Sequence, residues 1–124
     1  MTKILLVEDD FIMVTLLVTF LEVEGYEVVH VNGGENAYKV ENLLDVLQRE
    51  SPALVLMDVN LKHANGFDLL RGVRNDPDLH DVKVLMSSGM DFTYQCMQEG
   101  ADGFILKPYM PDELIDHIQK ILNR

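Results

Sequence analysis

The sequence predicts an α/β protein in which five parallel strands alternate with five helices. Short aliphatic runs alternate with longer segments of helical periodicity along the whole chain. Several of the runs are apolar at consecutive positions, as expected for strands that are covered on both faces. Five successive strand–helix units favour a single parallel sheet with right-handed crossovers.

The first unit consists of a strand over residues 3–7, three acids, and a helix over 11–24. Gly25 follows this helix at the position where a left-handed residue is often needed. Apolar residues occupy positions 11–14 and 16–18, so the helix has little polar face. We expect it to be packed deeply; an exposed apolar patch would instead mark a surface for a partner.

The remaining four units follow the same pattern. We expect strands over 27–31, 53–57, 82–86 and 104–106, and helices over 35–50, 67–75, 91–99 and 112–123. Pro77 lies beyond the third helix and Gly100 beyond the fourth. Pro111 suits the first turn of the last helix, where Asp112 and Glu113 lie near the positive end of the helix dipole.

Length and composition indicate one globular domain over residues 1–124. The chain is 48% hydrophobic, and its net charge of −11 disfavours direct binding to nucleic acid. No apolar run is long enough for a signal peptide or a membrane span, so we expect a cytoplasmic protein without membrane association. Cys96 is the one cysteine, and we expect it to be packed as a small apolar residue.

Polar residues follow the predicted strands at the edge where ligands bind in parallel sheets. Glu8-Asp9-Asp10 follows the first strand, Asp58 and Asn60 the third, Ser88 the fourth and Lys107 the fifth. Clustered carboxylates need a counter-charge, and hard oxygen ligands suit Mg²⁺. A carboxylate is also a competent nucleophile towards phosphorus, while Lys107 and Ser88 offer charge and a hydrogen bond to phosphoryl oxygens.

Each of these residues also has an ordinary structural interpretation. Asp9 or Asp10 suits the cap of the first helix, and Asp58 suits a turn after its strand. Ser88 would then lie in a loop, and Lys107 would be a solvated surface charge. Their joint occurrence at the ends of successive strands favours a shared site.

The stretches ILLVEDDF, LVLMDVNLKHANGFDLL, VLMSSG and GADGFILKPY resemble the receiver domains of two-component response regulators, and the resemblance covers essentially the whole chain. It implies a doubly wound, flavodoxin-like sheet with strand order 2-1-3-4-5 and helices on both faces. It also implies that Asp58 is the phosphoacceptor. Ser88 and Phe104 would be the switch residues, and Lys107 would contact the phosphoryl group.

The resemblance further implies a Mg²⁺ site made by Asp9, Asp10, Asp58 and Asn60. In this assignment Asp10 binds the metal directly, Asp9 binds it through water, and Asn60 offers its backbone carbonyl. Glu8 is not expected to be a ligand. The Lys107–Pro108 bond is a candidate for the cis form.

The chain departs from the family at three places. Lys62 stands where many members have proline, and Phe104 stands where tyrosine is common. The region from residue 33 to residue 50 is longer than is common. The first departure bears on phosphorylation kinetics and the second on the output of the switch.

The implied function is a signalling switch rather than a turnover enzyme. A histidine kinase or phosphotransfer protein would phosphorylate Asp58, and the domain would later dephosphorylate itself. The face made by the fourth helix, fifth strand and fifth helix would bind an effector or a second copy. Alternatives are a flavin-binding protein of similar fold, a phosphatase-like enzyme with Asp58 as nucleophile, and a receiver-like interaction domain that never takes phosphate.

Overall fold

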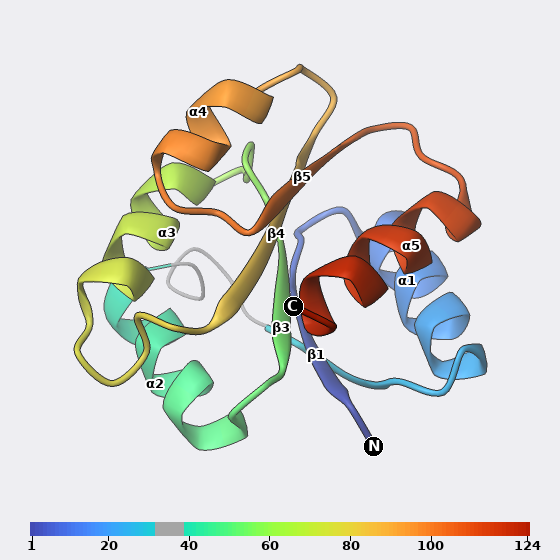
Figure 1. Cartoon of the computed structure of the whole chain (residues 1–124), viewed down its shortest axis with the longest axis horizontal. Helices are drawn as coiled ribbons and strands as arrows, with labels where there is room; N and C mark the ends of the chain where they lie inside the picture. The colour runs from blue at the N-terminus through green and yellow to red at the C-terminus, as the bar shows by residue number, and fades with distance from the viewer. Residues whose placement is uncertain (32–38) are drawn as a thin grey trace.

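The computed structural model describes residues 1–31 and 39–124. Within these residues, five parallel strands form one sheet in the order β2-β1-β3-β4-β5, which confirms the predicted fold class and strand order (Figure 1). The strands are β1 (Lys3–Val7), β2 (Glu27–His30), β3 (Leu54–Asp58), β4 (Lys83–Ser88) and β5 (Gly103–Leu106). The helices are α1 (Phe11–Val23), α2 (Val40–Glu50), α3 (Gly66–Asn75), α4 (Thr93–Gln98) and α5 (Pro111–Leu122).

The helices form a layer on each side of the sheet (Figure 1). Helices α1 and α5 cover one face, and α2, α3 and α4 cover the other. Each layer buries its own apolar cluster against the sheet, with Leu6 and Ile118 in the first and Met57 and Leu70 in the second. The central strands β1 and β3 therefore have apolar side chains on both faces, which explains their uninterrupted aliphatic runs.

Two helices are shorter than the sequence predicted. Helix α2 begins at Val40 because Lys39 has an extended backbone, and the predicted start at residue 35 lies outside the described residues. Helix α4 begins at Thr93 rather than at residue 91. The Asp91 carboxylate accepts hydrogen bonds from the backbone and hydroxyl of Thr93, so Asp91 forms a turn ahead of the helix.

The expected deep packing of α1 is wrong. Val14, Leu17 and Leu21 are buried, but Phe11 is 81% and Val23 is 80% exposed. Helix α1 therefore has more apolar side chains than its buried face can hold, and the remaining ones form an exposed apolar surface.

Two smaller expectations concern burial and membrane spans. Cys96 is fully buried, and burial raises the pKa of its thiol to about 11, so it behaves as a packed apolar residue. No helix in residues 1–31 and 39–124 has the length and apolar character needed to cross a bilayer.

Candidate functional site

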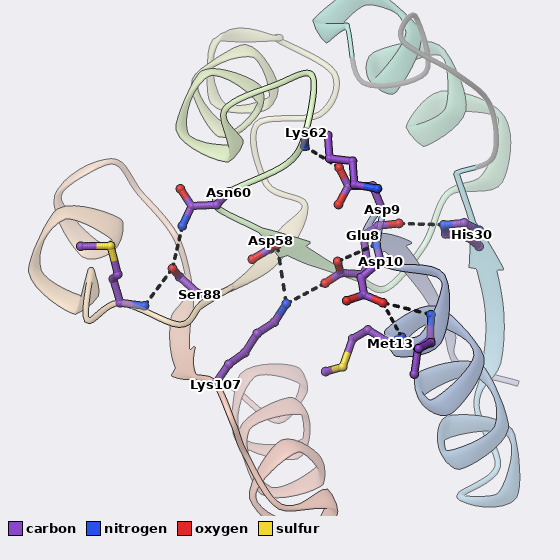
Figure 2. A network of polar contacts seen from close by, with 12 residues as sticks. Glu8, Asp9, Asp10, Met13, His30, Asp58, Asn60, Lys62, Ser88 and Lys107 are labelled. Carbon is purple, nitrogen blue, oxygen red and sulfur yellow. Dashed lines mark hydrogen bonds and ion pairs between the residues drawn. The ribbon is translucent and has the colours of Figure 1, made fainter.

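The predicted site residues meet at the carboxyl edge of the sheet. Asp58 is the last residue of β3 and pairs in register with Ser87 of β4. Ser88 ends β4, and Lys107 follows β5 directly. Figure 2 shows Lys107 extending between Asp58 and the acids after β1. The order of the strands thus gathers residues that lie up to a hundred positions apart.

Lys107 is the cation of this cluster. Its Nζ lies 2.8 Å from Glu8 Oε2 and 3.6 Å from Asp58 Oδ2. Burial lowers the pKa of Lys107, but the hydrogen bond and charge of Glu8, together with Asp58, outweigh this effect and the pKa is raised. The ammonium is therefore charged throughout the neutral range. The Lys107–Pro108 bond is cis, as expected.

Asp58 is a buried carboxylate with an unusual proton affinity. Only 7% of the residue is exposed. Burial raises its pKa, the Lys107 ammonium lowers it, and the charges of Glu8 and Asp9 raise it again, to about 6. The side chain is therefore mainly ionised at neutral pH, yet it lies in a pocket where a further cation or an added proton is favourable.

The three acids after β1 point to three different places. Glu8 is 4% exposed and reaches into the pocket towards Lys107. The Asp9 carboxylate accepts a hydrogen bond from the backbone of Lys62, in the loop after β3. The Asp10 carboxylate caps α1 by accepting from the N–H groups of Ile12 and Met13, at 3.0 and 3.2 Å.

This arrangement differs from the predicted acid pair. The carboxylates that act on Asp58 are those of Glu8 and Asp9, whereas Asp10 is exposed at the start of α1. The physical reason is the change from strand to helix. Because α1 begins at Phe11, the residue before it takes the cap, and Glu8 is left as the first side chain beyond the buried strand. The interpretation of Asp10 as a helix cap, first considered as the ordinary alternative, is confirmed.

Asn60 and Ser88 form the second half of the site. Asn60 Nδ2 donates to Ser88 Oγ at 3.0 Å, and the Met90 backbone N–H donates to the same oxygen at 3.1 Å (Figure 2). Since the hydroxyl oxygen accepts both bonds, the hydroxyl proton of Ser88 is available to a further acceptor. The fully buried Ser88 is thus held in position as a donor.

The loop after β3 is held close to the strand. Gly66 N donates to the Val59 carbonyl, and a bridge pairs Asn60 with Asn65. A Cβ at Gly66 would lie 2.4 Å from the Asp58 carbonyl oxygen, so the close approach requires glycine. Asn65 caps α3 through Phe67 N. Asn65 and Gly66 therefore fix the position of Asn60.

Phe104 lies behind the site. It pairs in register with Met86 on β4 and is 9% exposed within the apolar cluster that contains Cys96. The Lys107 backbone N–H donates to the Ser88 carbonyl at 2.8 Å, which links the ends of β4 and β5. Phe104 is thus turned inwards on the strand that leads to Lys107.

The donor set suits a divalent cation that also binds an incoming ligand. The carboxylates of Glu8 and Asp58 contact one ammonium and Asp9 adds its charge near Asp58, which leaves an excess of negative charge. Among the described residues, no group of three or more acidic, histidine or cysteine side chains is arranged to hold a metal by itself. Mg²⁺ is commonly bound by one or two carboxylates, with water and phosphate oxygens completing its shell.

Comparison with known proteins gives the family. The model of the response regulator receiver domain matches residues 4–119. The chain belongs to the response regulator receiver domain family. This receiver domain is 37% identical over 125 residues to the transcriptional regulatory protein CpxR homolog of Haemophilus influenzae, and the match covers 100% of the chain and 52% of that protein. The chain spans about half the length of the curated relatives it matches.

Solved structures agree with the family and the fold. The receiver domain of a signal transduction histidine kinase from Syntrophus aciditrophicus superposes with a TM-score of 0.83 at 27% identity, covering 99% of this receiver domain and 91% of that chain. The BeF3-activated N-terminal receiver domain of Klebsiella pneumoniae RstA gives 0.83 at 26% identity, covering 99% and 100%. Receiver domains similar to this one thus occur both in regulators and in kinases.

Proposed function

We propose that this receiver domain accepts a phosphoryl group on Asp58 from a phosphohistidine of a histidine kinase or phosphotransfer protein. The observation that carries the proposal is the pairing of a buried, ionisable Asp58 with the Lys107 ammonium 3.6 Å from its Oδ2. A carboxylate oxygen attacks phosphorus as the bond from phosphorus to the imidazole nitrogen breaks. The new bond is an acyl phosphate on Asp58, and the imidazole leaves.

A magnesium ion is part of this proposal. Asp9, Asp58 and the backbone carbonyl of Asn60 would hold the ion, with Glu8 rather than Asp10 as the second acid of the pair. When bound, Mg²⁺ neutralises charge on the carboxylates and on the phosphoryl oxygens. Asp10 was expected to bind the metal directly, but its Oδ1 accepts two N–H groups of α1, which favours a structural role.

The other residues of the site stabilise the transferred group. The Lys107 ammonium is close enough to Asp58 to contact phosphoryl oxygens there with a small movement of a flexible side chain. The Ser88 hydroxyl, whose oxygen already accepts from Asn60 and Met90, donates its proton to one of these oxygens. Most of the catalysis is positioning and charge stabilisation.

Phosphorylation would act as a switch rather than as one step of a turnover enzyme. A movement of Ser88 towards the phosphoryl group gives Phe104 space to shift, which changes the α4-β5-α5 face. That face exposes Tyr94, Met97, Leu106 and Met110. It would therefore bind an effector or a second copy, and hydrolysis of the acyl phosphate by water would end the signal.

The test is phosphorylation by a small donor. The protein is incubated with Mg²⁺ and acetyl phosphate, and its intact mass is measured at once and after hydroxylamine, which cleaves acyl phosphates. We expect one labile phosphoryl group on the parent and none on Asp58→Asn. Asp45→Asn, an exposed acid on α2, is the matched control and should be labelled like the parent. Equal labelling of Asp58→Asn and the parent would show that Asp58 is not the acceptor.

A further inference from the structure

The hydroxyl of Tyr109 is buried without a hydrogen bond. Among side-chain polar atoms of the described residues, Tyr109 Oη is the one that is shielded from solvent and has no partner. A buried donor without an acceptor destabilises a fold, and such groups call for an explanation. Phenylalanine would fill the same apolar space at no such cost. The hydroxyl is therefore better explained by a state in which it finds an acceptor.

Tyr109 lines an apolar groove and is close in the chain to the carboxylate pocket. It follows Lys107 by two residues, and its ring packs in the apolar layer beneath α1 and α5. With Met13 and Leu114 it lines a groove of about 560 Å³ between these helices. The backbone N–H of Met13 also donates to Asp10, so Met13 lines the groove and contacts the acids that follow β1.

The acids of the site act on the hydroxyl. Burial raises the pKa of Tyr109, and the charges of Glu8 and Asp58 raise it further. The hydroxyl is therefore a neutral donor in a region of negative potential. Carboxylate oxygens are the natural acceptors for such a donor.

Phosphorylation would change what Glu8 contacts. In the free protein, Lys107 Nζ lies closer to Glu8 Oε2, at 2.8 Å, than to Asp58 Oδ2, at 3.6 Å. A phosphoryl group on Asp58 brings more negative charge to the second contact and draws the ammonium towards it. Glu8 Oε1 accepts from the backbone of Asp10, and the residue is 4% exposed, so bulk water has little access to Oε2 as Lys107 turns away. A buried donor such as the Tyr109 hydroxyl can then hold the carboxylate in position while it also faces the proposed metal.

We propose that Tyr109 is a positioning residue for the phosphorylated state, in which its hydroxyl donates to Glu8 Oε2 as Lys107 turns to the phosphoryl group. The proposal rests on the proposed function of Asp58. The free protein tolerates an unpaired hydroxyl, and the phosphorylated protein uses it to hold Glu8 in place.

The experiment compares Tyr109→Phe with the parent in two states. The probe is beryllium trifluoride with Mg²⁺, a stable mimic of the phosphoryl group. We expect Tyr109→Phe to leave the Tm of the free protein unchanged or raised, because it removes an unpaired donor. We expect its dissociation constant for the probe to be about tenfold to a hundredfold weaker, as for the loss of one hydrogen bond to a charged group. Tyr26→Phe, in the same apolar layer, is the control and should bind like the parent.

Further readouts separate the alternatives. In the parent, addition of the probe should slow exchange of the Tyr109 hydroxyl proton in NMR spectra. A Tyr109→Phe variant that binds the probe like the parent would overturn the proposal, and would favour a buried water as the partner of the hydroxyl. A Tm loss that is equal in both states would also overturn it, in favour of a packing role. A parent that fails to bind the probe would instead overturn the proposed function, and this inference with it.

Discussion

At the scale of single residues, three adjacent carboxylates have different roles because the backbone turns from strand to helix among them. Glu8 is the buried partner of Lys107, Asp9 accepts from the loop after β3, and Asp10 caps α1. Their side chains differ little in chemistry. What differs is the set of donors that each one meets, and this sets which of them can serve a metal or a phosphoryl group.

The first prediction separates the helix cap from the proposed metal site. Asp10→Ala should lower the free energy of unfolding by about 1 kcal/mol, because two N–H groups of α1 lose their acceptor. Asp10→Asn keeps an acceptor and should be near the parent in stability. Both should bind Mg²⁺ almost as the parent does in isothermal titration calorimetry, whereas Asp9→Asn should bind it at least several-fold more weakly. A loss of affinity in Asp10→Asn equal to that in Asp9→Asn would contradict this division.

The sequence predicts the members of this site better than their roles. Asp58, Ser88 and Lys107 could be placed because each follows an apolar run, and the ends of parallel strands meet at one edge. The separate roles of Glu8, Asp9 and Asp10 could not be predicted, since consecutive acids give no periodicity. The preference of aspartate for the position before a helix was the available signal, and it applies to Asp10. Tyr109 gave no signal, because its unpaired hydroxyl is a property of packing.

At the scale of elements, two arginines on α3 connect this helix to its neighbours in different ways. Arg74 donates to the carbonyls of Gly100, His80 and Val82 and pairs with Asp102, whose carboxylate also accepts from Val84 N. Its side chain is 20% exposed. Arg71 pairs with Asp68 and, through two hydrogen bonds, with Glu99 beyond α4, and its side chain is 47% exposed.

The second prediction compares these arginines. Arg74→Ala should lower the free energy of unfolding by roughly 2–4 kcal/mol, because it removes the donor from the carbonyls of Gly100, His80 and Val82 and breaks the partly buried ion pair with Asp102. Arg71→Ala should cost clearly less, since exposed ion pairs are screened by water. Urea denaturation of both variants at neutral pH measures the difference. Equal losses of unfolding free energy would show that the ion pairs of Arg71 stabilise the fold as much as the contacts of Arg74 do.

The elements show where periodicity is informative and where it is not. Buried strands were predicted to within two residues at each end, because an apolar run ends where the chain leaves the core. The predicted start of α4 is less accurate, because the local turn of Asp91 replaces the first turn of the helix. The exposed face of α1 could not be predicted, since its apolar residues occur on all sides and burial depends on neighbours far along the chain.

At the scale of the whole molecule, stability and charge are linked through Asp58. The net charge is −11, so each further ionisation in a buried site adds to repulsion that the fold already bears. Asp58 has a pKa of about 6 in the fold, against an ordinary value of 3.8. Between these values the native state binds more protons than the unfolded state, and the free energy of unfolding therefore falls as the pH rises.

The last prediction concerns this fall in stability. Between pH 4 and pH 6, Asp58 should reduce the free energy of unfolding of the parent by roughly 1–3 kcal/mol, relative to a protein that lacks this carboxylate. Asp58→Asn should lack this part of the pH dependence and be more stable than the parent at pH 7. Asp81→Asn, whose side chain is 91% exposed in the parent, makes the same change in charge and should keep the parent's slope.

Magnesium provides a second test of the same prediction. Because Mg²⁺ binds ionised carboxylates, it should raise the free energy of unfolding of the parent at pH 7 and have little effect at pH 4. The effect should be much smaller in Asp58→Asn, which lacks one of the proposed ligands. Urea denaturation at both pH values, with and without Mg²⁺, measures all four states. A parent whose stability does not fall between pH 4 and pH 6 relative to Asp58→Asn would mean that Asp58 is solvated more fully than its 7% exposure indicates.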